Sequence, residues 1–132
     1  MNFRIVTISI GSSSSCIYTF ASHPANMPLW APAFVKSIAN VNGEWIADSN
    51  LGKVKIEFAP ANPFGVLDHV VTLPDGRAFN NPMRVVPNGA GSLVTFTLFR
   101  QDGMSDAEFE RDAGMVESDL QALKRVVEAL LG

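Results

Sequence analysis

The most regular hydrophobic pattern lies at the C-terminal end of the chain. Apolar residues recur there every three or four positions, at Phe109, Ala113, Val116, Leu120, Leu123, Val127 and Leu130. This spacing is typical of a helix with one apolar face. Ser105 and Glu108 have the spacing of a capping box, in which each side chain bonds the backbone N–H of the other residue. The sequence therefore predicts one long amphipathic helix over about 105–131.

Upstream of this helix, apolar residues follow a period of two, which is typical of strands with one buried face. Turn sequences such as Asn42-Gly43 and Pro74-Asp75-Gly76 separate the segments. These connections are too short for a parallel crossover, so neighbouring strands must be antiparallel. Pro82 interrupts one segment and suggests a bulge or an edge position. We predict seven strands, at 3–10, Phe34–Val41, Glu44–Asp48, Lys53–Ala59, Gly65–Leu73, Arg77–Val86 and Ser92–Arg100.

Two short helical segments are predicted between the first strand and the others. Ser12–Ser15 offers several N-cap hydroxyls, and a helix of two to three turns follows as far as about Pro24. The stretch Pro24–Pro32 contains three prolines, so it holds at most one helical turn, which carries Leu29 and Trp30.

The length of the chain favours a single domain over residues 1–132. The predicted C-terminal helix is about 40 Å long, whereas a domain of this size has a diameter near ~36 Å. The helix must therefore cross the whole molecule, and only the antiparallel sheet can cover its apolar face.

Composition narrows the function classes. Apolar residues make up 47% of the chain, charged residues 17%, and the net charge is −3. There is no basic excess, so we expect no nucleic-acid partner, and no apolar run reaches the ~18 residues of a membrane span. The alternation from Ile5 to Ile10 indicates a strand and not a signal peptide. Cys16 is the single cysteine, which excludes an intrachain disulfide, and a cytoplasmic location is expected.

Asp68 and His69 are adjacent and could suggest an acid–base pair. Adjacent strand residues point to opposite faces, so the two cannot act on each other. Leu67, Val71 and Leu73 share the parity of His69, so His69 is expected to face inward. Two interpretations stay open, a hydrogen-bonded core histidine and a cavity histidine that orients or deprotonates a ligand.

Other polar and aromatic candidates are weaker. Arg84 is expected to face outward and to pair with a strand neighbour. Trp30 is either plain core or, because it lies in a Pro-rich turn, a lid at a cavity mouth. Cap formation accounts for Ser12–Ser15, and the spacing of Cys16, His23 and His69 matches no metal site, so we expect neither metal nor cofactor.

Several segments resemble polyketide cyclase/dehydrase-like proteins of the START/Bet v 1-like (SRPBCC) superfamily. They are His23–Ile38, Gly43–Ile46, Gly65–Gly76, Asn81–Gly89 and Val94–Phe109. The resemblance implies an α+β helix-grip fold, in which a curved seven-stranded antiparallel sheet wraps on the long C-terminal helix and two short helices follow strand 1. It also implies a cavity for an apolar ligand between sheet and helix. It carries no catalytic residue over to this chain.

The expected function is binding of a small hydrophobic or aromatic ligand in that cavity. Two alternatives are a cyclase/aromatase-type enzyme acting on a polyketide-like substrate, with His69 as the catalytic candidate, and a co-chaperone-like protein-interaction module. Monomer and homodimer both stay open. The residues expected to line the cavity are Trp30, Phe34, Trp45, Phe58, His69, Met83, Phe96 and Met115.

Overall fold

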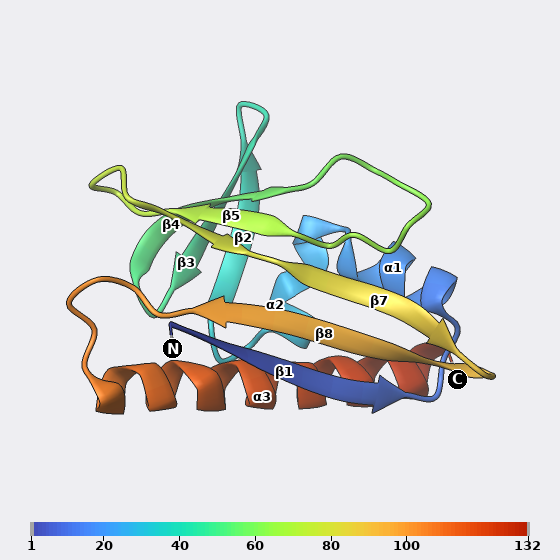
Figure 1. Ribbon diagram of the computed structural model, residues 1–132. Coiled ribbons are helices and arrows are strands. Elements are labelled where there is room, and N and C mark those ends of the chain that lie inside the picture. Colours follow the sequence, from blue (N-terminus) through green and yellow to red (C-terminus); the bar gives the residue numbers. More distant parts are fainter. Residues whose placement is uncertain (1, 132) are drawn as a thin grey trace.

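The computed structural model describes residues 2–131 (Figure 1). Its elements run in the order β1 (Phe3–Ile10), α1 (Ser14–Ala21), η1 (Pro24–Asn26), α2 (Met27–Trp30), β2 (Val35–Val41), β3 (Glu44–Ser49), β4 (Gly52–Phe58), β5 (His69–Thr72), β6 (Ala78–Asn81), β7 (Met83–Asn88), β8 (Gly91–Phe99) and α3 (Asp106–Leu131). The predicted α+β order of one strand, short helices, a meander of strands and a long helix is confirmed.

The short helices and the first tight turn form where the local sequence predicted them. Ser13 caps α1, because its Oγ accepts a hydrogen bond from the backbone N–H of Cys16 at 3.2 Å. The Pro-rich stretch holds a 3-10 turn and the single helical turn α2. Asn42 and Gly43 both have positive φ, 54° and 88°, as a tight turn between β2 and β3 requires.

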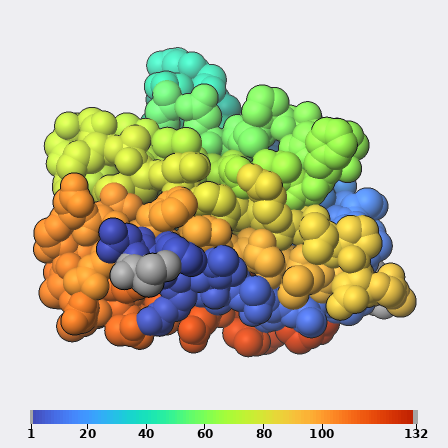
Figure 2. Space-filling view, in the orientation of Figure 1, coloured from blue at the N-terminus to red at the C-terminus, as the bar shows by residue number. Residues whose placement is uncertain are grey.

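The strands form two antiparallel sheets. One has the order β2-β3-β4-β5-β6 and the other the order β1-β8-β7. The sheets stay joined, because the N–H of Leu67 donates to the carbonyl of Met83 at 2.8 Å and the N–H of Val85 donates to that of Gly65 at 3.0 Å. Together they make a curved surface (Figure 1), and β1, β8 and β7 lie side by side on its outer face (Figure 2).

The structure has eight strands in residues 2–131, so the predicted count of seven is wrong. Pro82 divides the predicted strand Arg77–Val86 into β6 and β7, which belong to different sheets. Proline has no N–H to continue a ladder, and its carbonyl here accepts from the N–H of Thr97 on β8 at 2.9 Å. Pro82 therefore marks a change of sheet and not a bulge within one strand.

The predicted strand Gly65–Leu73 is regular only over β5. Gly65 has φ 72°, and a Cβ at this position would lie 2.1 Å from the carbonyl oxygen of Val85. Val66 forms an isolated bridge with Arg84. Close approach to β7 therefore bends the chain before β5 begins.

Helix α3 starts one residue later than predicted, and its capping box is formed. The N–H of Ser105 donates to Glu108 Oε1 at 3.0 Å, and the N–H of Glu108 donates to Ser105 Oγ at 3.1 Å. The helix runs beside β1 along the lower edge of the molecule (Figures 1 and 2). Its buried apolar residues are Phe109, Ala113, Leu120, Ala122, Leu123 and Val127.

The apolar stripe of α3 is shorter than predicted. Leu130 is 65% exposed, so the buried face ends at Val127. Leu120, Leu123 and Val127 join one core with Val6, Ile10 and other buried residues of the sheet and short helices. The C-terminal half of α3 is thus the part that packs tightly.

This packing predicts different costs for two leucines of the same helix. Leu123→Ala should lower the free energy of unfolding by about 2–5 kcal/mol, because the leucine is fully buried and a cavity would remain. Leu130→Ala should change it by less than about 0.5 kcal/mol, because the leucine is mostly exposed. Urea unfolding measures both, and equal midpoints for the two variants would show that α3 does not pack as described.

Candidate ligand-binding site

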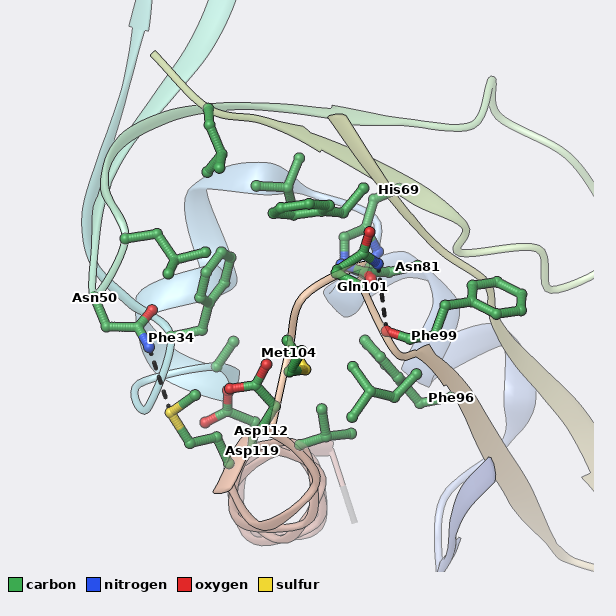
Figure 3. A pocket seen from close by; sticks show the side chains of 18 of the residues that line it. Phe34, Asn50, His69, Asn81, Phe96, Phe99, Gln101, Met104, Asp112 and Asp119 are labelled. Carbon is green, nitrogen blue, oxygen red and sulfur yellow. Dashed lines mark hydrogen bonds between the residues drawn. The ribbon is translucent and has the colours of Figure 1, made fainter. Parts of the chain in front are cut away.

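A cavity of about 420 Å³ lies between the sheet, α2 and the N-terminal half of α3 (Figure 3). The helices contribute Met27, Trp30, Glu108, Asp112, Met115, Val116, Asp119 and Leu120. The strands contribute His69, Val71, Phe79, Asn81, Phe96, Leu98 and Phe99. Connecting segments contribute Ala31, Phe34, Asn50, Leu51, Leu73, Arg77, Gln101, Asp102, Gly103 and Met104. Most of this lining is apolar or aromatic.

The cavity opens to solvent at one end. The exposed lining residues are Asn50 and Leu51 from the β3–β4 turn, Arg77 from the β5–β6 turn, Phe99 at the end of β8, Asp102 and Gly103 from the segment before α3, and Glu108 from the first turn of α3. Asn50 Nδ2 lies 3.4 Å from Met115 Sδ and connects the β3–β4 turn to α3 (Figure 3). These turns and the start of α3 therefore border the open side of the cavity.

His69 lies inside, as its parity on the strand predicted. It is 3% exposed, and its ring lies between Phe58 and Phe96, with centroids 5.0 and 5.9 Å away. His69 Nδ1 is 3.0 Å from the carbonyl oxygen of Leu67. A carbonyl can only accept a hydrogen bond, so Nδ1 carries the proton and Nε2 has the free lone pair.

Burial sets the charge state of this histidine. Desolvation lowers the pKa of His69, and the bond to Leu67 and the charge of Asp68 oppose the shift only partly. The ring is therefore neutral near pH 7. Within residues 2–131, Nε2 has no hydrogen-bond partner. His69 thus presents an unpaired acceptor in the wall of the cavity.

Asp68 points to the opposite face of the sheet, which confirms the predicted alternation. Its carboxylate accepts two hydrogen bonds from the Arg84 guanidinium, at 2.7 and 2.8 Å, and one from the N–H of Met83. Arg84 is thereby the main cause of the lowered pKa of Asp68. The outward direction of Arg84 and its pairing with a strand neighbour are also confirmed.

The charged side of the cavity comes from α3. Asp112 and Asp119 point their carboxylates from the helix into the cavity (Figure 3). Sequence analysis did not identify these two residues as site residues. Their spacing from Glu108, four and eleven positions, places all three on one helix face beside the apolar stripe, and this signal was present in the sequence.

Asp119 connects α3 to the segment that follows α2. It is 6% exposed, and its Oδ1 accepts a hydrogen bond from the N–H of Ala33 at 2.8 Å. Burial raises the pKa of Asp119 to about 6, against the lowering effect of the N–H groups of Ala33 and Phe34. This carboxyl therefore holds the α2 side of the cavity against α3.

Asp112 is half-buried one turn after Glu108. Desolvation raises its pKa, the charge of Arg111 opposes the shift, and Glu108 adds to it. Asp112 has neither a hydrogen-bond partner nor an ion-pair partner among the described residues. It is thus a carboxyl without a bonded partner in the cavity wall.

Trp30 belongs to the wall and is not a lid. Within α2, Met27 and Trp30 face the core, whereas Leu29 is 54% exposed. Trp30 is 2% exposed, and its Nε1–H is buried without a partner in the described part of the chain. The single helical turn directs the indole inward although the segment around it is Pro-rich.

The structure brings together five of the eight residues expected to line the cavity, namely Trp30, Phe34, His69, Phe96 and Met115. Trp45, Phe58 and Met83 lie outside its lining. Trp45 is half-buried and packs edge-on against His23, with centroids 6.1 Å apart. Phe58 stacks on His69 within the sheet, and Met83 is fully buried in the packed core. The alternation of side chains along the strands correctly predicted that Phe58 and Met83 face inward. They lie outside the cavity because they pack against neighbouring side chains.

Two further features concern ions and membranes. In residues 2–131, no three His, Cys, Asp or Glu side chains are grouped so that they could hold a metal ion. None of the described helices is both long enough and apolar enough to cross a membrane.

This chain is similar to known proteins in its structure and not detectably in its sequence. No family model matches the sequence, and the search of curated proteins found no match. Solved structures do match over nearly the whole chain. The protein XoxI from Bacillus cereus has 16% sequence identity and a TM-score of 0.73, covering 96% of this chain and 95% of that one. A START superfamily protein from Mycobacterium smegmatis has 17% identity and a TM-score of 0.71, covering 98% of this chain and 99% of that one.

The chain has the START/Bet v 1-like fold. This confirms the helix-grip architecture that the resemblance implied. The di-domain ARO/CYC BexL from the BE-7585A biosynthetic pathway has the same fold, with 17% identity and a TM-score of 0.71. The match covers 97% of this chain and 47% of BexL.

The raised pKa of Asp119 predicts how stability changes with pH. The folded chain binds a proton at Asp119 near pH 6, whereas an unfolded Asp does so near its ordinary value of 3.8. Asp119 therefore costs stability progressively as pH rises from about 4 to about 6. Asp119→Asn keeps an oxygen for Ala33 and carries no charge, so the variant should gain stability relative to the parent over this range.

Urea unfolding at pH 4.5 and pH 7.5 measures this difference. The matched control is Glu117→Gln, which removes one charge from an exposed position of the same helix. If the difference in unfolding free energy between Asp119→Asn and the parent is the same at both pH values, the pKa of Asp119 is not raised by burial.

Proposed function

We propose that this chain binds a small hydrophobic or aromatic ligand in the cavity between the sheet and α3. One observation carries the proposal, namely an open cavity of about 420 Å³ with an apolar and aromatic lining. Small-molecule sites have volumes of roughly 300–1,000 Å³ and this type of lining. An exposed surface groove for a protein partner would place these aromatic side chains at the surface, whereas Trp30 and Phe96 are buried.

The cost of leaving the cavity empty supports the same conclusion. Protein interiors pack as densely as organic crystals, and voids larger than a water molecule are few. Met115, Val116 and Leu98 line the cavity and are only half-buried, so they lack the packing partners that Leu123 and Val127 have. An apolar ligand would supply those contacts and remove the exposed apolar area from water.

Binding should stabilise the fold and change the fluorescence of one of the two tryptophans. With 4-phenylbutanol or decanol at 100 times the dissociation constant, stability should rise by about 2.7 kcal/mol through mass action. Trp30 lines the cavity and Trp45 does not. The ligand-induced emission change should therefore persist in Trp45→Phe and disappear in Trp30→Phe.

Thermal melts and a fluorescence titration measure the two effects. If neither alcohol raises the melting temperature, the cavity does not bind apolar ligands. If the emission change disappears in Trp45→Phe and persists in Trp30→Phe, the ligand binds outside this cavity.

A second function, proton transfer on a bound ligand, has support from one observation. His69 is neutral, its Nδ1–H is held by the carbonyl of Leu67, and its Nε2 has a free lone pair in the cavity wall. A general base needs this arrangement of a fixed tautomer and an open acceptor. The ring could remove a proton from a carbon next to a carbonyl and return one from solvent.

Deuterium exchange tests this second function without knowledge of the natural substrate. With 4-phenyl-2-butanone in D₂O, the parent chain should speed exchange at the carbons next to the carbonyl, and His69→Gln should reduce this rate by about 10²-fold. His23→Gln is the matched control, because His23 is exposed and lies outside the cavity. Equal rates for the parent and His69→Gln, read by mass spectrometry, would exclude His69 as the base.

A further inference from the structure

We infer that the ligand carries a protonated amine on its apolar body, and that Asp112 binds this amine. The inference rests on the proposed binding function and names the chemical class of the ligand. It follows from the signs of the charges in the cavity wall, from which of these charges already have partners, and from the hydrogen-bonding role of the buried His69.

The charges in the cavity wall are mostly negative. The acidic lining residues are Asp102, Glu108, Asp112 and Asp119, and the basic lining residue in the described chain is Arg77. Arg77 is exposed, and its Nε donates to the carboxylate of Asp75 at 2.8 Å on the outer turn. Its charge is therefore already compensated, and a bound cation would be attracted to the cavity.

Asp112 is the acidic residue that is half-buried in the cavity wall and free to pair with a ligand. Glu108 accepts from the N–H of Ser105 in the capping box, and Asp119 accepts from the N–H of Ala33. Asp112 is half-buried and has no partner within residues 2–131. A charge that is partly removed from water and has no bonded partner is costly, so an ammonium group that pairs with Asp112 would offset part of this cost.

The helix dipole does not account for Asp112. Acidic residues stabilise the first turn of a helix, and the effect falls off beyond it. Asp106 and Glu108 lie in that first turn, whereas Asp112 lies in the second. Its place beside Met115 and Val116 on the cavity side therefore needs another reason, and a cationic ligand supplies one.

An independent observation comes from the other side of the cavity. His69 is 97% buried, since its exposed fraction is 3%, and its unpaired Nε2 is an acceptor. A ligand that donates hydrogen bonds can satisfy this atom. A carboxylate has no hydrogen to donate, and it would also meet the negative charges of α3. The cavity therefore disfavours anionic ligands such as fatty acids.

The test compares three probes that share one body and differ in the head group. They are 4-phenylbutylamine, 4-phenylbutanol and 4-phenylbutanoate, and calorimetry at pH 7.5 gives their affinities. The amine should bind about tenfold more tightly than the alcohol, as for a charge-assisted hydrogen bond, and the carboxylate should bind most weakly. In Asp112→Asn the preference for the amine should be lost, so that the amine binds about as tightly as the alcohol.

Glu117→Gln is the matched control, because it removes one negative charge from an exposed position of α3 outside this cavity. It should keep the preference for the amine. A cooperative thermal melt of Asp112→Asn without ligand shows that the variant is folded.

Each other outcome contradicts a distinct part of the account. Equal affinities of the three probes for the parent would overturn the amine inference and leave the binding function standing. A preference that survives in Asp112→Asn, or a loss of all three probes in that variant, would overturn the role of Asp112. If none of the probes binds the parent, the proposed binding function fails and the inference fails with it.

Discussion

A straight helix packs against a curved sheet, and this mismatch in shape produces both the packed core and the cavity. Helix α3 is 26 residues long, and its apolar stripe faces the core along most of that length. In its C-terminal half, Leu123 and Val127 are fully buried against the sheet and the short helices. In its N-terminal half, Met115 and Val116 line an open cavity instead. One continuous apolar stripe therefore supplies both the packed core and the wall of the binding site.

The polar groups of the cavity follow from the same arrangement. Strand β5 directs His69 inward and leaves Asp68 outside with Arg84, so the cavity receives a neutral acceptor in place of an ion pair. Asp119 fixes the segment after α2 through the N–H of Ala33, and this segment carries Phe34 next to the buried Trp30. Asp112 remains as the free carboxyl. The result is an apolar site that offers a free acceptor on His69 and a free carboxylate on Asp112.

Features that depend on local periodicity could be predicted from the sequence. The capping box at Ser105, the extent of α3 and the opposite directions of Asp68 and His69 all follow from the spacing of neighbouring residues. Features that depend on how distant segments meet could not be predicted. The chain passes from one sheet to the other at Pro82, where the carbonyl of Pro82 bonds to Thr97 of β8. Trp30 is buried because α2 packs on α3. The same holds for Phe58 and Met83, which face inward where packing leaves no space.

The proposed ligand lies in the space between the sheet and the N-terminal half of α3. Amide chemical-shift mapping with saturating 4-phenylbutylamine is the sharpest test of this position, because it locates the bound probe residue by residue. We expect shifts at Phe34, Leu98 and Val116, which lie on three different segments around the cavity, and none at the outward-facing Val41 and Arg84. Shifts confined to the outer face, or none anywhere in the chain, would exclude binding in this cavity.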